Sequence, residues 1–166
     1  MPPLGRMMLH GAVLTSVSTL VLLACLIANP RLLLEDYPAD VQRAVPPKTD
    51  RERRTALLVG VPFLGFMLLF PAWSTWTQYR ASGTPPTLEA LFLNTFVVAS
   101  AFNAFDLLVL DWLLFCTLRP RFIVLPGTEG MPGYRDYFFH FRGFLIGTAL
   151  SAALAVIVAV IVRVTS

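Results

Sequence analysis

The chain has 166 residues, of which 56% are hydrophobic and only 14% are charged, whereas soluble domains contain about a quarter charged residues. This composition excludes an ordinary soluble domain. The formal net charge of +3 comes from arginines that are scattered in loops, which argues against a nucleic-acid-binding stripe.

Four apolar stretches are long enough to cross a bilayer. A spanning helix needs about 20 mostly apolar residues, and unbroken runs of this kind are unlike the alternating segments of a membrane barrel. The sequence therefore predicts an all-α membrane protein, a single domain over residues 1–166 whose four transmembrane helices form an antiparallel bundle with short outer loops. The expected spans are 9–29, 56–73, 88–114 and 144–162, and the two longer cytoplasmic loops are 30–54 and 115–143.

Local patterns mark where several helices begin. Thr49 and Glu52 match a capping box, in which each side chain satisfies a backbone N–H of the other residue. The second long helix is therefore expected to start before its apolar stretch. Thr87 is a suitable cap for the third helix, and Pro38 can open a short helix that ends near Val45.

Basic residues are distributed unevenly between the two sides of the predicted domain. Only Arg6, Arg80 and Arg163 flank one side. Ten flank the other side, namely Arg31, Arg43, Lys48, Arg51, Arg53, Arg54, Arg119, Arg121, Arg135 and Arg142. Cytoplasmic loops carry the excess of positive charge, so we expect a multi-pass protein of a bacterial-type plasma membrane with both termini outside.

One face of the third span is polar. A helical wheel of about 100° per residue collects this face within an arc of about 140°, and its members are Ser100, Asn103, Asp106 and Asp111. A charge near the bilayer centre costs roughly 3 kcal/mol, so an intramembrane Asp is a functional-site candidate.

Asp106 has two interpretations. It can relay protons or cations, because desolvation favours the protonated carboxyl. Alternatively, it is a structural tie that works through Asn103 and a hydroxyl of the first span. The hydroxyls considered are those of Thr15, Ser16, Ser18 and Thr19.

A second candidate cluster lies at the inner membrane surface. Asp111 is expected at the depth where the fourth span begins, so either Arg142 or His140 could form a salt bridge with it. The alternative interpretation joins Asp111, Tyr137, His140 and Arg142 into an acid–base and anion-binding group for a lipid headgroup.

Small residues recur at every fourth position of the fourth span, at Gly143, Gly147, Ser151, Ala155 and Ala159. Such a seam lets helix backbones approach closely. We expect it to pack within the chain, with a homo-oligomer as the alternative.

The histidines and cysteines do not predict a cofactor. His10 and His140 are expected at opposite membrane faces, so they cannot both ligate one haem within a subunit. Cys25 and Cys116 offer neither a disulfide framework nor the spacing of a zinc site, and they are interpreted as small buried hydrophobic residues. We expect no metal and no haem.

No familiar catalytic motif is present, which makes an enzyme the less favoured class. The sequence favours an accessory, assembly or scaffold component of a membrane complex, with the bilayer and a protein at the cytoplasmic loops as partners. One alternative is a small proton or cation transporter or channel that uses Asp106. Another is a membrane-surface enzyme or lipid-headgroup binder that uses Asp111, His140 and Arg142.

Overall fold

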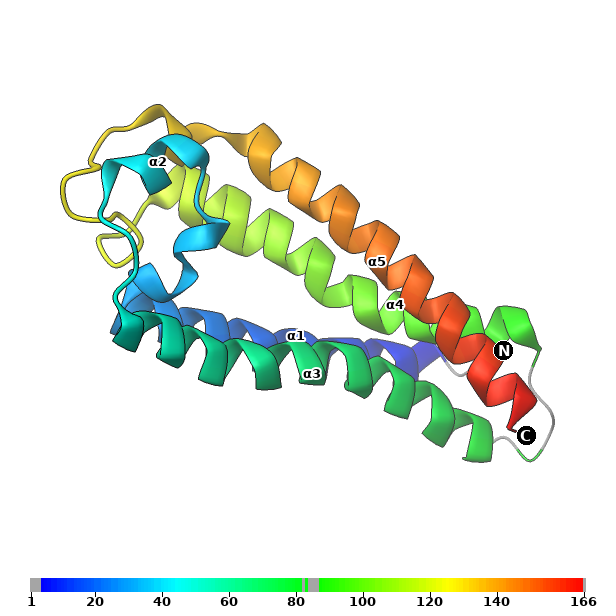
Figure 1. Ribbon diagram of the computed structural model, residues 1–166. Helices are drawn as coiled ribbons and strands as arrows, with labels where there is room; N and C mark the ends of the chain where they lie inside the picture. Colours follow the sequence, from blue (N-terminus) through cyan, green and yellow to red (C-terminus); the bar gives the residue numbers. More distant parts are fainter. Residues whose placement is uncertain (1–3, 82, 84–86, 166) are drawn as a thin grey trace.

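The computed structural model describes residues 4–81, 83 and 87–165, and within these ranges the chain forms helices and loops but no strand. Four long helices run along the molecule (Figure 1): α1 (Leu4–Ala28), α3 (Asp50–Ala81), α4 (Leu88–Phe105), which continues as η2 (Asp106–Leu118), and α5 (Tyr137–Val164). All four are long and apolar enough to cross a membrane. Three short helices, η1 (Pro30–Asp36), α2 (Ala39–Ala44) and η3 (Pro132–Arg135), lie in the connections.

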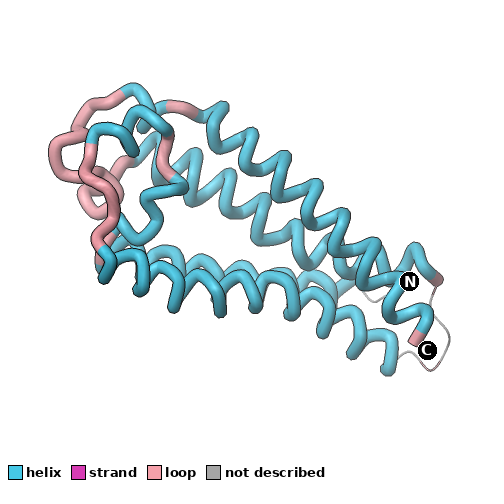
Figure 2. Tube along the Cα trace, in the orientation of Figure 1, coloured by secondary structure: helices cyan, strands magenta, loops and turns pink. Residues whose placement is uncertain are grey.

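The short helices and longer loops gather at one end of the molecule, which we call the cap end (Figure 2). Both chain termini lie at the other end, the terminus end (Figure 1). The prediction of a four-helix membrane protein is confirmed at this level.

The helices extend beyond the apolar stretches because their polar ends are capped. Thr49 and Glu52 form the predicted capping box, with the Thr49 N–H donating to Glu52 Oε2 (2.7 Å) and the Glu52 N–H to Thr49 Oγ1 (3.2 Å). The Thr87 hydroxyl accepts from the Ala90 N–H at the start of α4. The Asp136 carboxylate accepts from the Phe139 N–H, so α5 starts well before the predicted residue 144. The short helix after Pro38 is also confirmed.

Helix α4 is central, because α1, α3 and α5 all pack against it. Between α1 and α4 the packing is close: a Cβ added at Gly11 would lie 2.9 Å from the Cβ of Ala101. Leu14, Val98 and Phe102 form one buried cluster where these helices meet. In contrast, only 6% of the most apolar window of α3 is buried, so most of this helix is available to lipid.

The small residues of α5 pack mainly inside the chain. A side chain at Gly147 would overlap the amide of Asn103 on α4, and Ser151, Ala155 and Ala159 are buried. Gly143 is different, because it is exposed and a Cβ there would meet nothing within 4 Å. The close approach of α4 and α5 therefore begins at Gly147.

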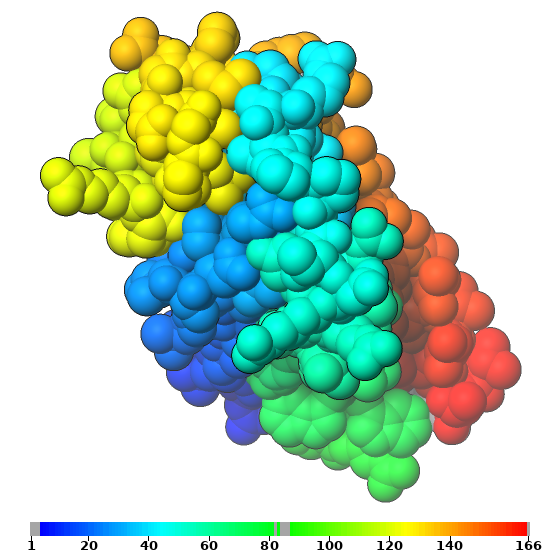
Figure 3. All heavy atoms as spheres, turned by 60° about the vertical axis from the view of Figure 1, so that its left-hand side comes forward, coloured from blue at the N-terminus to red at the C-terminus, as the bar shows by residue number. Residues whose placement is uncertain are grey.

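At the cap end, two segments far apart in sequence form one folded body, which we call the cap (residues 30–49 and 119–136). The Tyr37 hydroxyl donates to the Ile123 carbonyl (2.8 Å), the Leu125 N–H donates to the Tyr134 hydroxyl (2.9 Å), and the Gly133 N–H donates to Asp40 Oδ2 (2.9 Å). Figure 3 shows both segments side by side over the end of the bundle.

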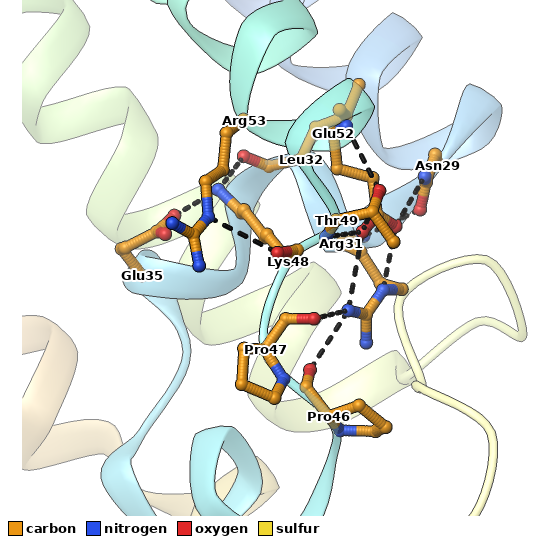
Figure 4. Close-up of polar contacts among 10 residues, drawn as sticks. All are labelled: Asn29, Arg31, Leu32, Glu35, Pro46, Pro47, Lys48, Thr49, Glu52 and Arg53. Carbon is orange, nitrogen blue, oxygen red and sulfur yellow. Dashed lines mark hydrogen bonds and ion pairs between the residues drawn. The ribbon is translucent and has the colours of Figure 1, made fainter.

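Two basic residues have specific partners at the junction of the cap and α3 (Figure 4): Arg31 joins the cap to α3, and Lys48 holds the cap segment 30–49 together. Arg31 pairs with Glu52 (Nε–Oε1, 2.8 Å) and also donates to the carbonyls of Pro46 and Pro47. Lys48 is buried, where it pairs with Glu35 and donates to the Leu32 carbonyl (2.6 Å). Both residues entered the sequence analysis only as charges in a loop, but the structure gives each a specific partner.

Candidate functional site

The segment that carries Asp106 and Asp111 is a π-helix, η2, which directly continues α4. Its hydrogen bonds join residues five apart, as in the bond from the Arg119 N–H to the Leu114 carbonyl (2.8 Å). Residues i and i+5 are therefore separated by a smaller angle around the helix axis than in an α-helix. The wheel of 100° per residue was wrong for this segment, because it separates Asp106 from Asp111 by more than a quarter turn. The π-helix instead brings the two carboxylates towards one face.

Asp111 pairs with His140, one of the two alternative partners that the sequence left open. Nδ1 of His140 lies 2.9 Å from Asp111 Oδ1. The imidazole is only 6% exposed, and Phe115 packs edge-on against it with ring centroids 4.8 Å apart. Within the described part of the chain, Nε2 of His140 is buried and has no hydrogen-bond partner.

A third carboxylate reaches this pair from the cap. Asp36, the last residue of η1, is within electrostatic reach of Asp111 and His140. Asp36 as a whole residue is exposed. The pKa of its carboxyl group is nevertheless raised, first by desolvation and then by the Glu35 and Asp111 carboxylates. Asp106 is in turn within electrostatic reach of both Asp111 and Asp36.

We call Asp36, Asp106, Asp111 and His140 the acid–histidine cluster. Its members come from η1, η2 and α5, so the fold assembles it from three segments. Sequence reasoning found three of the four residues and missed Asp36. This residue lies outside the apolar stretches, and no local pattern separates it from Glu35.

Asn103 does not contribute the structural tie expected of it. Its amide donates to the Phe144 carbonyl (3.1 Å) and to the Thr148 hydroxyl (3.0 Å), both on α5. The expectation of a hydroxyl partner on the first span was therefore wrong. Gly147 leaves room for the Asn103 amide against α5, and the α1 hydroxyl of Ser18 instead donates to the sulfur of Met67.

The remaining residues of the two predicted groups have other environments. The Ser100 hydroxyl is buried and, among the described residues, has no hydrogen-bond partner. The Tyr137 hydroxyl lies 2.9 Å from that of Thr117. Arg142 is exposed on α5, while the Asp111 carboxylate is engaged by His140.

A second set of buried polar groups, which we call the polar network, lies towards the terminus end. It joins α1, α3 and α4. Asn94 donates to the hydroxyls of Thr75 (2.8 Å) and Ser74 (3.2 Å) and accepts from the Gln78 amide. The hydroxyls of Thr75 and Thr95 lie 2.7 Å apart. His10 reaches the same network through Ser74 (2.7 Å).

Sequence analysis assigned none of these α3 residues to a site. Ser74, Thr75 and Gln78 stand at helical spacing and face Asn94. A polar stripe of this kind, opposite an intramembrane Asn, is the signal that could have predicted the network.

The two histidines serve different ends of the molecule. His10 is near the start of α1 at the terminus end, and His140 is near the start of α5 at the cap end (Figure 1). Among the described residues, no group of three or more His, Cys, Asp or Glu side chains could hold a metal ion. Cys25 and Cys116 are buried and free.

No protein-family model, no curated protein and no solved structure matches the chain.

The acid–histidine cluster can hold and exchange protons. A carboxylate that accepts from one imidazole nitrogen fixes the orientation of the ring. The other nitrogen, Nε2, is then left to give or accept a proton.

Proposed function

We propose that the chain is a four-span antiparallel protein of a bacterial-type plasma membrane, with both termini outside and the cap in the cytoplasm. In this proposal, the acid–histidine cluster binds protons on the cytoplasmic side, and the protein is a small proton or cation transporter. The observation that carries the proposal is the Asp111–His140 pair, whose imidazole is buried while its Nε2 has no partner within the described residues.

The position of the cluster supports this function. Asp36 belongs to the cap and is exposed, whereas Asp106 begins the π-helix inside the apolar third helix. A proton can therefore pass from the cap surface to a carboxyl at membrane depth through groups that already interact. Ionisable residues within spanning helices are costly and commonly mark such pathways.

Flux through purified protein in liposomes tests the proposal. An acid pulse outside the vesicles should acidify the lumen, reported by a trapped pH-sensitive dye, faster than in protein-free vesicles. Asp106→Asn should reduce this flux to the leak rate of protein-free vesicles, because an amide side chain does not take up or release a proton as a carboxyl group does. His140→Asn should do the same, since the Asn amide can still donate to Asp111 but has no atom at the position of Nε2.

Asp50→Asn is the matched control. It also removes one carboxylate, but from an exposed position at the start of α3, and it should leave the flux unchanged. Flux equal to the leak for the unmodified protein, or full flux in Asp106→Asn, would exclude a transport role for the cluster.

A second candidate function is that of an accessory component whose cap contacts a partner protein. The observation that favours it is the folded cap, which the Gly133–Asp40 hydrogen bond and the buried Tyr37 and Tyr134 make into a rigid surface. Native mass spectrometry of gently extracted protein would then detect a stoichiometric partner. Asp40→Ala, which removes the acceptor for Gly133, should release that partner without changing proton flux.

A further inference from the structure

A hollow of about 640 Å³ opens on the side of the cap next to the end of η2. Its walls come from residues 118–134, drawn yellow-green to yellow in Figure 3. Leu118, Val124 and the buried Tyr134 supply apolar surface, and Arg119 and Arg121 supply two guanidinium groups. None of these residues belongs to the acid–histidine cluster.

The chain positions these arginines through its backbone. Arg119 ends η2 in a left-handed conformation (φ 48°), the only non-glycine residue with positive φ in the described ranges. The loop then curves around the hollow through Gly127 and Gly130, whose φ angles of 83° and 78° are readily adopted by glycine. Among the residues that line the hollow, Glu129 is the one carboxylate.

We propose that this hollow binds the headgroup of an anionic phospholipid at the cap-end membrane surface. Charge complementarity supports this ligand: two guanidinium groups can each donate paired hydrogen bonds to a phosphate, and basic residues at the membrane surface attract anionic lipid. The position of the hollow supports a lipid in particular. Leu118, which is 61% exposed, ends a helix apolar enough to span a membrane, so an acyl chain can lie along η2 while the phosphate reaches the arginines.

The Glu129 carboxylate shapes the selectivity. It accepts from the Gly127 N–H (3.2 Å), yet its negative charge opposes a phosphate in the same hollow. We expect the site to prefer a headgroup with a neutral polar extension, such as phosphatidylglycerol, over inorganic phosphate, which offers no acyl chain to offset this repulsion.

Binding of phosphatidylglycerol to the full chain in detergent, measured by titration with native mass spectrometry, tests the proposal. The double variant Arg119→Gln/Arg121→Gln should bind at least about tenfold more weakly, because it loses two charge-assisted contacts. Arg121→Gln alone changes an exposed side chain, so it keeps the test interpretable if the double variant fails to fold. Glu129→Gln should bind more tightly.

The matched control is Arg51→Gln/Arg54→Gln, which removes the same charge from exposed positions on α3 at the cap end. It should retain the affinity of the unmodified protein. Equal losses in both double variants would overturn the site, because they would show attraction to net charge alone. Binding of phosphatidylcholine or of inorganic phosphate as tight as that of phosphatidylglycerol would overturn the assignment of the ligand.

Discussion

The two buried polar regions of this molecule differ in the charge of the groups that form them. The polar network at the terminus end consists of neutral hydroxyls and amides with an imidazole, and it links three helices through short hydrogen bonds. The acid–histidine cluster at the cap end contains three carboxylates and an imidazole whose Nε2 has no partner among the described residues. Neutral groups that hydrogen-bond between helices hold the helices together, whereas a group of carboxylates around an imidazole can change its protonation state.

The largest effect on stability should come from the polar network. Asn94→Leu removes an amide that makes hydrogen bonds to Ser74, Thr75 and Gln78, and it leaves their polar atoms buried in an apolar environment. We expect a loss of about 2 kcal/mol in the free energy of unfolding, measured by denaturation in mixed micelles. Proton flux per folded molecule should not change.

Thr95→Val serves as the control for this variant, because it keeps the shape of the side chain and removes a single hydroxyl, which contacts Thr75 and the Leu91 carbonyl. Its loss should be well below that of Asn94→Leu. Equal losses would mean that the amide contributes no more than a single hydroxyl, and the network would not be the unit that joins the three helices.

The sequence predicts features that depend on neighbouring residues and fails for features created by tertiary packing. Hydropathy identified the four long helices, and the caps at Thr49 and Thr87 follow from spacings of three residues. The expected depth of Asp111 near the start of the fourth span limited its partner to Arg142 or His140, and only the structure selects His140. The π-helix could not be predicted, since no local residue type requires i→i+5 bonding. The approach of Asp36 depends on how the cap folds.

The cluster should show an intermediate effect on stability and a separate effect on function. Asp111→Ala deprives the buried imidazole of its acceptor and should cost about 1 kcal/mol, because the carboxylate is partly solvated. Asp111→Asn keeps an oxygen that can accept from Nδ1, so it should recover most of the unfolding free energy. Flux should stay low in both variants. If Asp111→Asn recovered both stability and flux, the Asp111–His140 pair would have only a structural role.

The smallest effect should be the pH dependence contributed by Asp36. Desolvation, together with the Glu35 and Asp111 carboxylates, raises the pKa of Asp36 in the folded protein. The folded state therefore holds the Asp36 proton more tightly than the unfolded chain does. The resulting stabilisation is present at low pH and is lost as pH rises from the ordinary carboxyl range through the raised pKa. Asp36→Asn removes the repulsion and should stabilise the protein near neutral pH by less than about 0.5 kcal/mol, since an exposed charge is screened.

Thermal unfolding of both proteins from pH 4 to pH 8 measures this difference. The two melting curves should converge at the acidic end and separate as the pH rises, with Asp36→Asn the more stable. Asp40→Asn removes a cap carboxylate that instead accepts a hydrogen bond from Gly133, so it should destabilise the protein or leave it unchanged near neutral pH. A stabilisation shared by both variants would reflect net charge. A stabilisation confined to Asp36→Asn would show that the carboxylates near Asp36, namely Glu35 and Asp111, repel it in the folded protein.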